Sequence, residues 1–223
     1  MVQEIDIWWE AYEDVLADHY KSFIIDEQSA AKIEWFQHSI VPGLLQTEGY
    51  AIAISKLKWL PIETQREADA SVAIRTKRQW NIMDRKTRPK IHIIIDESML
   101  YRPIGGKGVL YEQLVHLLKV ADAKHVTLQT LPINQGGEQY PYGVLCFTIF
   151  TPKDAKRRPT LYCDNPPHFS KPVVGVSSLT MYRRAFASLS DLADTPNNSK
   201  LRIMRAIEAL DNSTGLHAPL AEN

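Results

Sequence analysis

Apolar residues recur at intervals of three and four along the first third of the chain, which predicts amphipathic helices. Four segments carry a helical pattern or lack any residue that would stop a helix: residues 5–22, 26–37, 47–58 and 63–83. The last of these has no glycine or proline and predicts one long helix. The N-terminal part, residues 1–84, is therefore expected to be helical.

A helix-breaking turn separates the second and third of these segments. Pro42 fixes its own φ and biases Val41 away from helical geometry, while Gly43 can adopt backbone angles closed to other residues. We expect the chain to change direction here, with Thr47 as the N-cap of the helix that follows.

The pattern changes after residue 89. Residues 91–95 are β-branched and apolar apart from His92, which predicts a strand covered on both faces. An amphipathic helix at 109–120 and a strand at 125–131 follow. Strand, helix and strand at this spacing predict a parallel, right-handed crossover.

A hairpin and two helices complete the pattern. Residues 143–150 are expected to pair with 160–163, apolar positions from 179 to 189 predict a helix, and Thr195-Pro196 opens a last one. The fold class predicted is α+β: a helical N-terminal part, a small mixed sheet with one βαβ crossover and a hairpin, and C-terminal covering helices. The expected boundaries are a single domain over 1–211, with sheet and helices in 90–211, and a flexible tail over 212–223.

Composition narrows the class of protein. Apolar residues make up 44% of the 223 residues and charged residues 23%, as in ordinary globular domains. Lys plus Arg and Asp plus Glu both total 26, so no basic excess indicates nucleic-acid binding. No apolar stretch approaches the ~20 residues that cross a bilayer. We expect a cytoplasmic protein without a membrane partner.

Candidate chemistry is sparse. The two cysteines, Cys146 and Cys163, lack zinc spacing and are expected to be reduced core residues. The histidines show no metal spacing, and the serines lie in no nucleophile motif. We therefore expect no metal and no cofactor.

Three polar residues share one side of the long helix predicted at 63–83. Arg75, Arg78 and Gln79 fall on one face at 3.6 residues per turn, so two guanidinium groups could bind a carboxylate or phosphate. A structural ion pair with Glu27 or Glu97 explains the same pattern. The sequence leaves both interpretations open.

Two further polar residues lie where strands or turns end. Gln46, just past the turn, could cap exposed backbone groups or donate to a ligand. Glu97 follows the strand at 91–95 and could act as a general base, since ligand sites gather at the carboxyl ends of parallel strands. Alternatively, Asp96 is an N-cap and Glu97 pairs with Arg102 or Arg78.

Short motifs recur in order along nearly the whole chain. They are Trp8-Trp9 with Tyr12, Glu27, the run from Val41 to Thr47 with Tyr50, Arg75-x-x-Arg78-Gln79, Asp96-Glu97-x-x-Leu100-x-Arg102-Pro103-x-Gly105, Gln113-Leu114, Leu131-Pro132, and Tyr162. With these motifs the chain resembles the C-terminal domain that follows an XRE-type helix-turn-helix in many actinobacterial transcription regulators.

The resemblance implies a sensing or partner-binding role. Because Trp8-Trp9 and Tyr12 already match the first helix of the domain, we expect a domain without the helix-turn-helix and without sequence-specific DNA binding. The family also tends to carry a histidine in the Gly-rich loop before the hairpin, whereas residues 135–143 contain none.

The leading functional hypothesis is a stand-alone sensory or regulatory-type domain that binds a small molecule or a protein partner. Its small-molecule version predicts a cavity between the long helix and the sheet, lined by Gln46, Tyr50, Arg75, Arg78, Gln79, Glu97 and Arg102. Its partner-binding version predicts an exposed apolar patch that includes Trp8, Trp9 or Trp59.

An alternative is an enzyme recruited from such a domain, a transferase of specialised metabolism using an aminoacyl-tRNA or nucleotide donor. It predicts a carboxylate or tyrosine of perturbed pKa in a cleft, with Glu97 as the candidate catalytic residue. The tRNA version adds a basic rim made by Arg85, Lys86, Arg88, Lys153, Lys156, Arg157 and Arg158. A third hypothesis is a modulator that forms mixed complexes with related full-length regulators.

Overall fold

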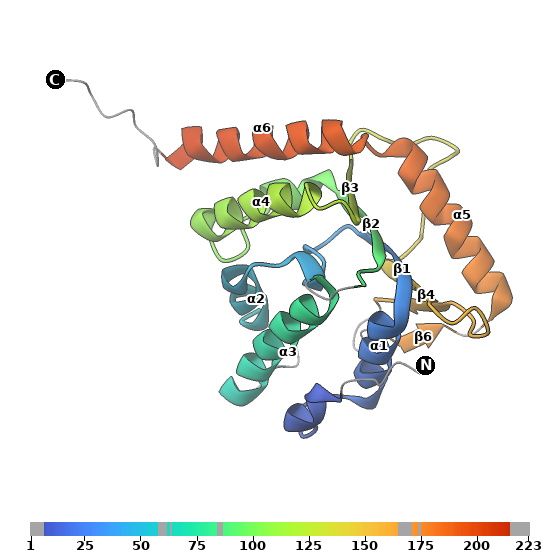
Figure 1. Ribbon diagram of the computed structural model, residues 1–223. Coiled ribbons are helices and arrows are strands. Elements are labelled where there is room, and N and C mark those ends of the chain that lie inside the picture. The colour runs from blue at the N-terminus through green and yellow to red at the C-terminus, as the bar shows by residue number, and fades with distance from the viewer. Residues whose placement is uncertain are drawn as a thin grey trace.

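A mixed sheet forms the centre of the molecule (Figure 1). The computed structural model describes residues 7–57, 62, 64–83, 87–164, 171–173 and 175–214. Within these, six strands lie in the order β3-β2-β1-β4-β5-β6. They are β1 (Ala30–Gln37), β2 (Lys90–Asp96), β3 (Val126–Leu131), β4 (Phe147–Pro152), β5 (Thr160–Cys163) and β6 (Lys171–Val173).

Helices cover both faces of the sheet. The longer ones are α1 (Asp18–Ser29), α2 (Glu48–Ser55), α3 (Gln65–Met83), α4 (Lys107–Ala121), α5 (Val176–Leu192) and α6 (Pro196–Thr214). Three short 3-10 helices are η1 (Trp8–Tyr12), η2 (Gly43–Leu45) and η3 (Glu97–Tyr101). The α+β class, with a largely helical N-terminal part, is therefore confirmed.

The sheet changes direction between β1 and β4. β1, β2 and β3 run parallel, with Ile33 opposite Ile91 and Ile91 opposite Val126. β4, β5 and β6 pair antiparallel, and β4 joins β1 with Phe150 opposite Ile33. The predicted parallel β2-α4-β3 crossover and the β4–β5 hairpin are both confirmed, although β4 begins at Phe147 rather than at residue 143.

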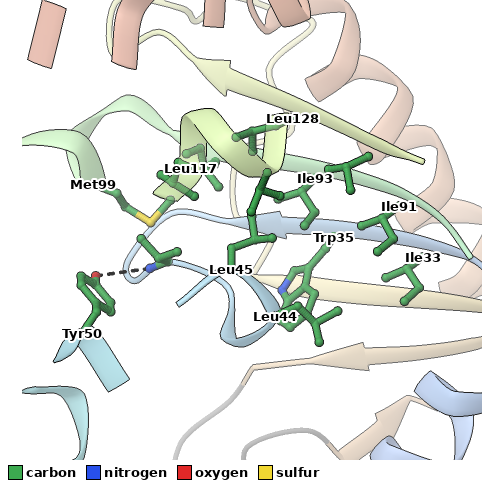
Figure 2. Close-up of a cluster of buried hydrophobic side chains, with 14 of the residues drawn as sticks. Ile33, Trp35, Leu44, Leu45, Tyr50, Ile91, Ile93, Met99, Leu117 and Leu128 are labelled. Atoms are coloured by element: carbon green, nitrogen blue, oxygen red, sulfur yellow. Dashed lines mark hydrogen bonds between the residues drawn. The ribbon is translucent and has the colours of Figure 1, made fainter. Parts of the chain in front are cut away.

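Alternate residues of each central strand enter two separate cores. On one face, Ile93 and Trp35 pack with Leu44 and Leu45 of η2 and with side chains of α4 (Figure 2). On the other face, Ile94 joins a second cluster that α5 covers. Because both faces of β2 are buried, its sequence is almost continuously apolar.

Two of the predicted helices are wrong. Residues 30–37 form β1, a central strand, because Ile33 and Trp35 face one core while Phe36 faces the other. Both faces are buried, so the sequence lacks the polar alternation that marks a half-covered strand. The segment 5–22 is also divided, since Ala17 is extended (φ −63°, ψ 142°) between η1 and α1.

Local capping explains why other boundaries match the prediction. The Thr47 hydroxyl accepts a bond from the Tyr50 N–H at 3.3 Å and opens α2, as predicted. Thr195 opens α6 in the same way through the Asn198 N–H at 3.3 Å. α6 continues to Thr214, past the predicted end at 211, and most of the predicted tail, residues 215–223, lies outside the described residues.

Apolar side chains of the described helices pack against the sheet. Among them, none is both long and apolar enough to span a bilayer.

Candidate functional site

The turn after β1 is held by side chains that the sequence suggests as ligand-binding residues. Gln79 Nε2 donates to the carbonyl oxygens of Gly43 and Gln46, both at 2.8 Å. Gln46 Nε2 donates to the Val41 carbonyl at 2.7 Å. The Tyr50 hydroxyl accepts from the Val41 N–H at 3.4 Å, a bond drawn in Figure 2. These contacts satisfy backbone groups that the tight turn leaves unpaired.

A glutamine from α4 completes this network. Gln113 Nε2 donates to the Leu45 carbonyl at 2.7 Å, and its Oε1 accepts from the Thr47 N–H at 2.8 Å. Gln113 is fully buried. Both amide groups of Gln113 are paired, as burial requires, whereas Gln46 uses only its Nε2 and its Oε1 is buried without a partner among the described residues. Gln113, Gln46 and Gln79 all support the turn through the backbone groups that they bind.

Arg78 forms a structural ion pair, which is one of the two interpretations of its helix face. Its Nε and Nη2 bind Glu27 Oε2 and Oε1 at 2.8 and 2.7 Å. A third nitrogen, Nη1, donates to the Tyr20 hydroxyl. Burial alone would lower the pKa of Arg78, but the Glu27 carboxylate and Tyr20 outweigh it and raise that pKa. The pair joins α3 to α1.

Arg75 has a different environment from Arg78. Its Nη1 donates to the Ser71 hydroxyl at 3.1 Å, and no acidic side chain of the described residues lies within ion-pair distance. Burial lowers its pKa, Tyr20 opposes this, and the charge of Arg78 adds to it. Arg75 is the member of the predicted cluster that keeps an uncompensated charge.

Glu97 binds a partner that sequence spacing does not indicate. Its Oε1 pairs with Arg202 Nη1 at 2.6 Å, and its Oε2 accepts from the Ile133 N–H at 2.8 Å. Arg202 also binds Asp194 at 2.6 Å. The predicted pairing of Glu97 with Arg78 or Arg102 is therefore wrong. Arg102 instead donates to the Ser39 carbonyl at 3.0 Å from an exposed position.

The seven predicted site residues thus lie in several separate structural networks. Gln46, Tyr50 and Gln79 hold the turn, Arg78 joins two helices, and Glu97 anchors α6. None of the seven lines either of the two hollows described next.

The first hollow, which we call the aromatic groove, lies between η1, α2 and α3 and has a volume of about 890 Å³. Most of its lining is apolar or aromatic. The residues are Trp8, Ala11, Tyr12, Glu48, Ile52, Asp69, Val72, Ala73, Thr76, Lys77 and Trp80. Trp8 is one of the three tryptophans that the partner-binding hypothesis names. Trp9 is buried, and Trp59 lies outside the described residues.

The walls of the aromatic groove are anchored to α3. Trp9 is 4% exposed and packs in a cluster with Ala70 and Ile74, and it meets Trp8 edge to face at 5.7 Å. On the opposite wall, Trp80 is 59% exposed, with the Lys77 ammonium 4.7 Å from its ring centre. The buried Trp9 therefore holds the wall of the groove against α3, while Trp8 and Trp80 line the groove itself.

The second hollow, which we call the carboxyl-end hollow, has a volume of about 370 Å³. It opens where β1 and β2 end and β4 begins. Its lining combines one carboxylate, one histidine, two tyrosines and apolar groups: Phe36, His38, Asp96, Tyr140, Pro141, Tyr142, Gly143, Val144 and Leu189. The Gly-rich loop before the hairpin thus lines a cavity, although it lacks a histidine of its own.

Groups with strongly raised pKa values lie outside both hollows. Burial raises the pKa of Asp164 to about 6, although Gln37 donates to its carboxylate. Burial also raises the pKa of Tyr162, whose hydroxyl binds Asp26 at 2.8 Å. Arg157, predicted to be in a basic rim, pairs with the same Asp26 at 3.0 Å. The raised pKa values of Asp164 and Tyr162 therefore result from burial and from contacts within the fold.

The described residues do not assemble a metal site. No group of three or more His, Cys, Asp or Glu side chains among them could hold a metal ion. Cys146 and Cys163 are free and buried.

A comparison with family models gives one match. The model described as Domain of unknown function (DUF5753) matches residues 20–205, from α1 through the sheet and into α6. Neither a curated protein nor a solved structure matches the chain. Because the match extends over most of the 223 residues, the chain belongs to the DUF5753 family.

Proposed function

We propose that the protein is a sensory-type domain that binds an apolar small molecule in the aromatic groove. The observation that carries this proposal is the groove itself: a volume of about 890 Å³ bordered by Trp8, Tyr12 and Trp80. Small-molecule sites typically span about 300–1,000 Å³ and combine apolar walls with a few polar groups. Here Asp69, Lys77 and Glu48 supply the polar groups.

Trp80 supplies much of the expected binding energy. More than half of this side chain is exposed in the free protein. Burying the exposed part of such a ring contributes on the order of 3 kcal/mol, from about 25 cal/mol per Å² of apolar surface. A flat apolar ligand lying on the face of Trp80 that Lys77 does not cover would gain part of this energy.

Trp8 adds a polar requirement for the ligand. Its indole N–H is buried and has no acceptor among the described residues. Unsatisfied donors of this kind are uncommon in folded proteins. A ligand with a hydrogen-bond acceptor that reached this N–H would satisfy the donor.

The position of α2 supports a sensory use of the groove. α2 contributes Glu48 and Ile52 to the groove and begins directly after the turn that follows β1. Gln79 and Gln113 bind that turn from α3 and α4. A ligand that displaces α2 would therefore act on a network shared by three elements. The resemblance to the C-terminal domain of XRE-type regulators supports the same role.

The test titrates the full chain with 8-anilinonaphthalene-1-sulfonate, an anionic dye with apolar aromatic rings whose fluorescence rises in apolar surroundings. We expect saturable binding that Trp80→Ala weakens at least about tenfold, since roughly 1.4 kcal/mol corresponds to that factor. Ala73→Phe, which fills the floor of the groove, should abolish binding. Met204→Ala is the matched control, because Met204 is exposed on α6, outside the groove.

Two outcomes would overturn the proposal. The first is dye binding that is equal in the parent, Trp80→Ala and Ala73→Phe. The second is a parent that is dimeric in analytical ultracentrifugation while Trp80→Ala is monomeric, which would make the groove an interface with a second copy. Circular dichroism melting of each variant checks that the fold is retained.

A further inference from the structure

The carboxyl-end hollow shares no lining residue with the aromatic groove and lies where the sheet changes from parallel to antiparallel pairing. β1 and β2 are parallel and end together at Gln37 and Asp96, while β4 begins beside β1 on its other side. Ligands of open α/β sheets bind outside the carboxyl ends of parallel strands, and the hollow lies at the carboxyl ends of β1 and β2.

A carboxylate without a cationic partner lies in this hollow. Asp96 Oδ1 accepts bonds from the Ser98 N–H at 2.9 Å and the Ser98 hydroxyl at 2.5 Å. No lysine or arginine of the described residues is within ion-pair distance of Asp96. The neighbouring Glu97 is different, since Arg202 neutralises it. Asp96 therefore keeps a negative charge that is free to attract a cation.

Aromatic rings line the same hollow as this carboxylate. The Tyr140 and Tyr142 rings lie 4.8 Å apart at 48°, and Phe36 lies 6.0 Å from the His38 ring. Burial raises the pKa of Tyr140, and the charge of Asp96 raises it further, as expected for a phenol near the carboxylate. Aromatic faces attract ammonium groups through their quadrupoles.

The loop that carries the tyrosines is shaped by glycines. Gly137 and Gly143 have φ of +89° and +80°, where other residues are strained. The Gly137 N–H donates to the Tyr142 hydroxyl at 3.3 Å, so the loop is closed on itself around its second tyrosine. The rings are thereby placed over the strand ends.

From these contacts we propose that the carboxyl-end hollow binds a small organic cation. Its ammonium group pairs with Asp96, and its apolar substituent packs against Tyr140 and Tyr142. The volume of about 370 Å³ suits a compact molecule with one ring or a short chain.

The test titrates the full chain with 2-phenylethylamine, which is a cation at neutral pH, and with 2-phenylethanol, its neutral analogue. Amide chemical shifts from ¹H–¹⁵N NMR report the site, and tetramethylammonium serves as a second cationic probe. We expect millimolar binding of both cations that shifts the amides of residues 137–140 and 142–144. The alcohol should bind at least about tenfold more weakly, because a charged partner strengthens a hydrogen bond by that order.

Two matched variants separate charge from fold. Asp96→Asn keeps an oxygen for Ser98 and should weaken amine binding about tenfold while leaving alcohol binding unchanged. Asp154→Asn is the control, because Asp154 also accepts from a backbone N–H two residues later, Lys156 at 2.9 Å, but lies outside the hollow. It should change neither affinity.

The proposal fails if neither cation shifts these amides in the millimolar range. It also fails if amine and alcohol bind equally, or if Asp96→Asn binds the amine as the parent does. None of these results bears on the aromatic groove, whose dye titration is read separately.

Discussion

Replacing Arg78 by methionine tests whether this residue supports the fold or serves a ligand. The Arg78 and Glu27 side chains are 4% and 0% exposed, and two hydrogen bonds of 2.8 and 2.7 Å join them. Arg78→Met leaves the Glu27 carboxylate buried without its partner. Breaking such a pair from one side costs roughly 3–5 kcal/mol.

This loss of free energy predicts how far the melting temperature should fall. For a chain of this length, 1 kcal/mol shifts the melting temperature by about 2–4 °C, so Arg78→Met should lower it by roughly 6–20 °C. Urea unfolding followed by tryptophan fluorescence gives the free energy directly. The double variant Glu27→Met/Arg78→Met should recover most of the loss, because removing both charges also removes their desolvation cost.

A second bidentate pair is the matched control. Arg66 binds Asp14 at 2.7 and 2.8 Å, nearly the same distances, but on the surface. Exposed pairs contribute little, so Arg66→Met should leave the transition almost unchanged. The reasoning is refuted if Arg78→Met costs under about 1 kcal/mol, or if the double variant is no more stable than the single one.

Three further predictions concern stability and reactivity. Burial raises the pKa of the Asp164 carboxyl from 3.8 to about 6. Between these two pH values the folded protein keeps a proton that the unfolded chain releases. The free energy of unfolding therefore falls as the pH rises through about 6. Asp164→Asn should therefore be more stable than the parent in urea unfolding at neutral pH, on the order of 1–3 kcal/mol, and equal stability there would contradict this. Gly105 has φ +78°, and a Cβ there would lie 2.6 Å from the Ala53 Cβ. Gly105→Ala should therefore lower the free energy of unfolding by about 2 kcal/mol or more in the same assay. In the control Gly108→Ala the added Cβ meets open space, so this variant should be as stable as the parent. Burial raises the pKa of Cys146 to about 11, so iodoacetamide at about pH 8 should alkylate it in the unfolded chain and not in the native one, as mass spectrometry would show.

Structural features that depend on contacts between residues close together in the chain can be predicted from the sequence. The cap at Thr47 joins atoms three residues apart, and Asp96 caps η3 through Ser98, two residues away. The continuous apolar run of β2 likewise predicts a strand covered on both faces. These elements follow from local backbone chemistry and burial, so the α+β class and the crossover can be derived from the order of the residues alone.

The strand β1 could not be recognised from the sequence, because its residues do not show the alternation of apolar and polar positions typical of a strand. Residues 33–37 are all buried, which removes the alternation by which strands are distinguished from helices. Only the pairing of β1 with β2 and β4 decides its conformation. The turn with Pro42 and Gly43 lies where the sequence predicts it, but it follows a strand and not a helix.

The sequence alone determined which side chains could form polar contacts, and the tertiary structure decided which of them meet. Glu97 binds Arg202, which lies 105 residues further along the chain, and Arg78 selects Glu27 from two candidate acids. The carboxyl-end hollow likewise depends on a loop near Tyr140 lying over Asp96. Contacts at such separations depend on how the layers pack, because spacing along a chain carries no information about neighbours that only the folded sheet brings together.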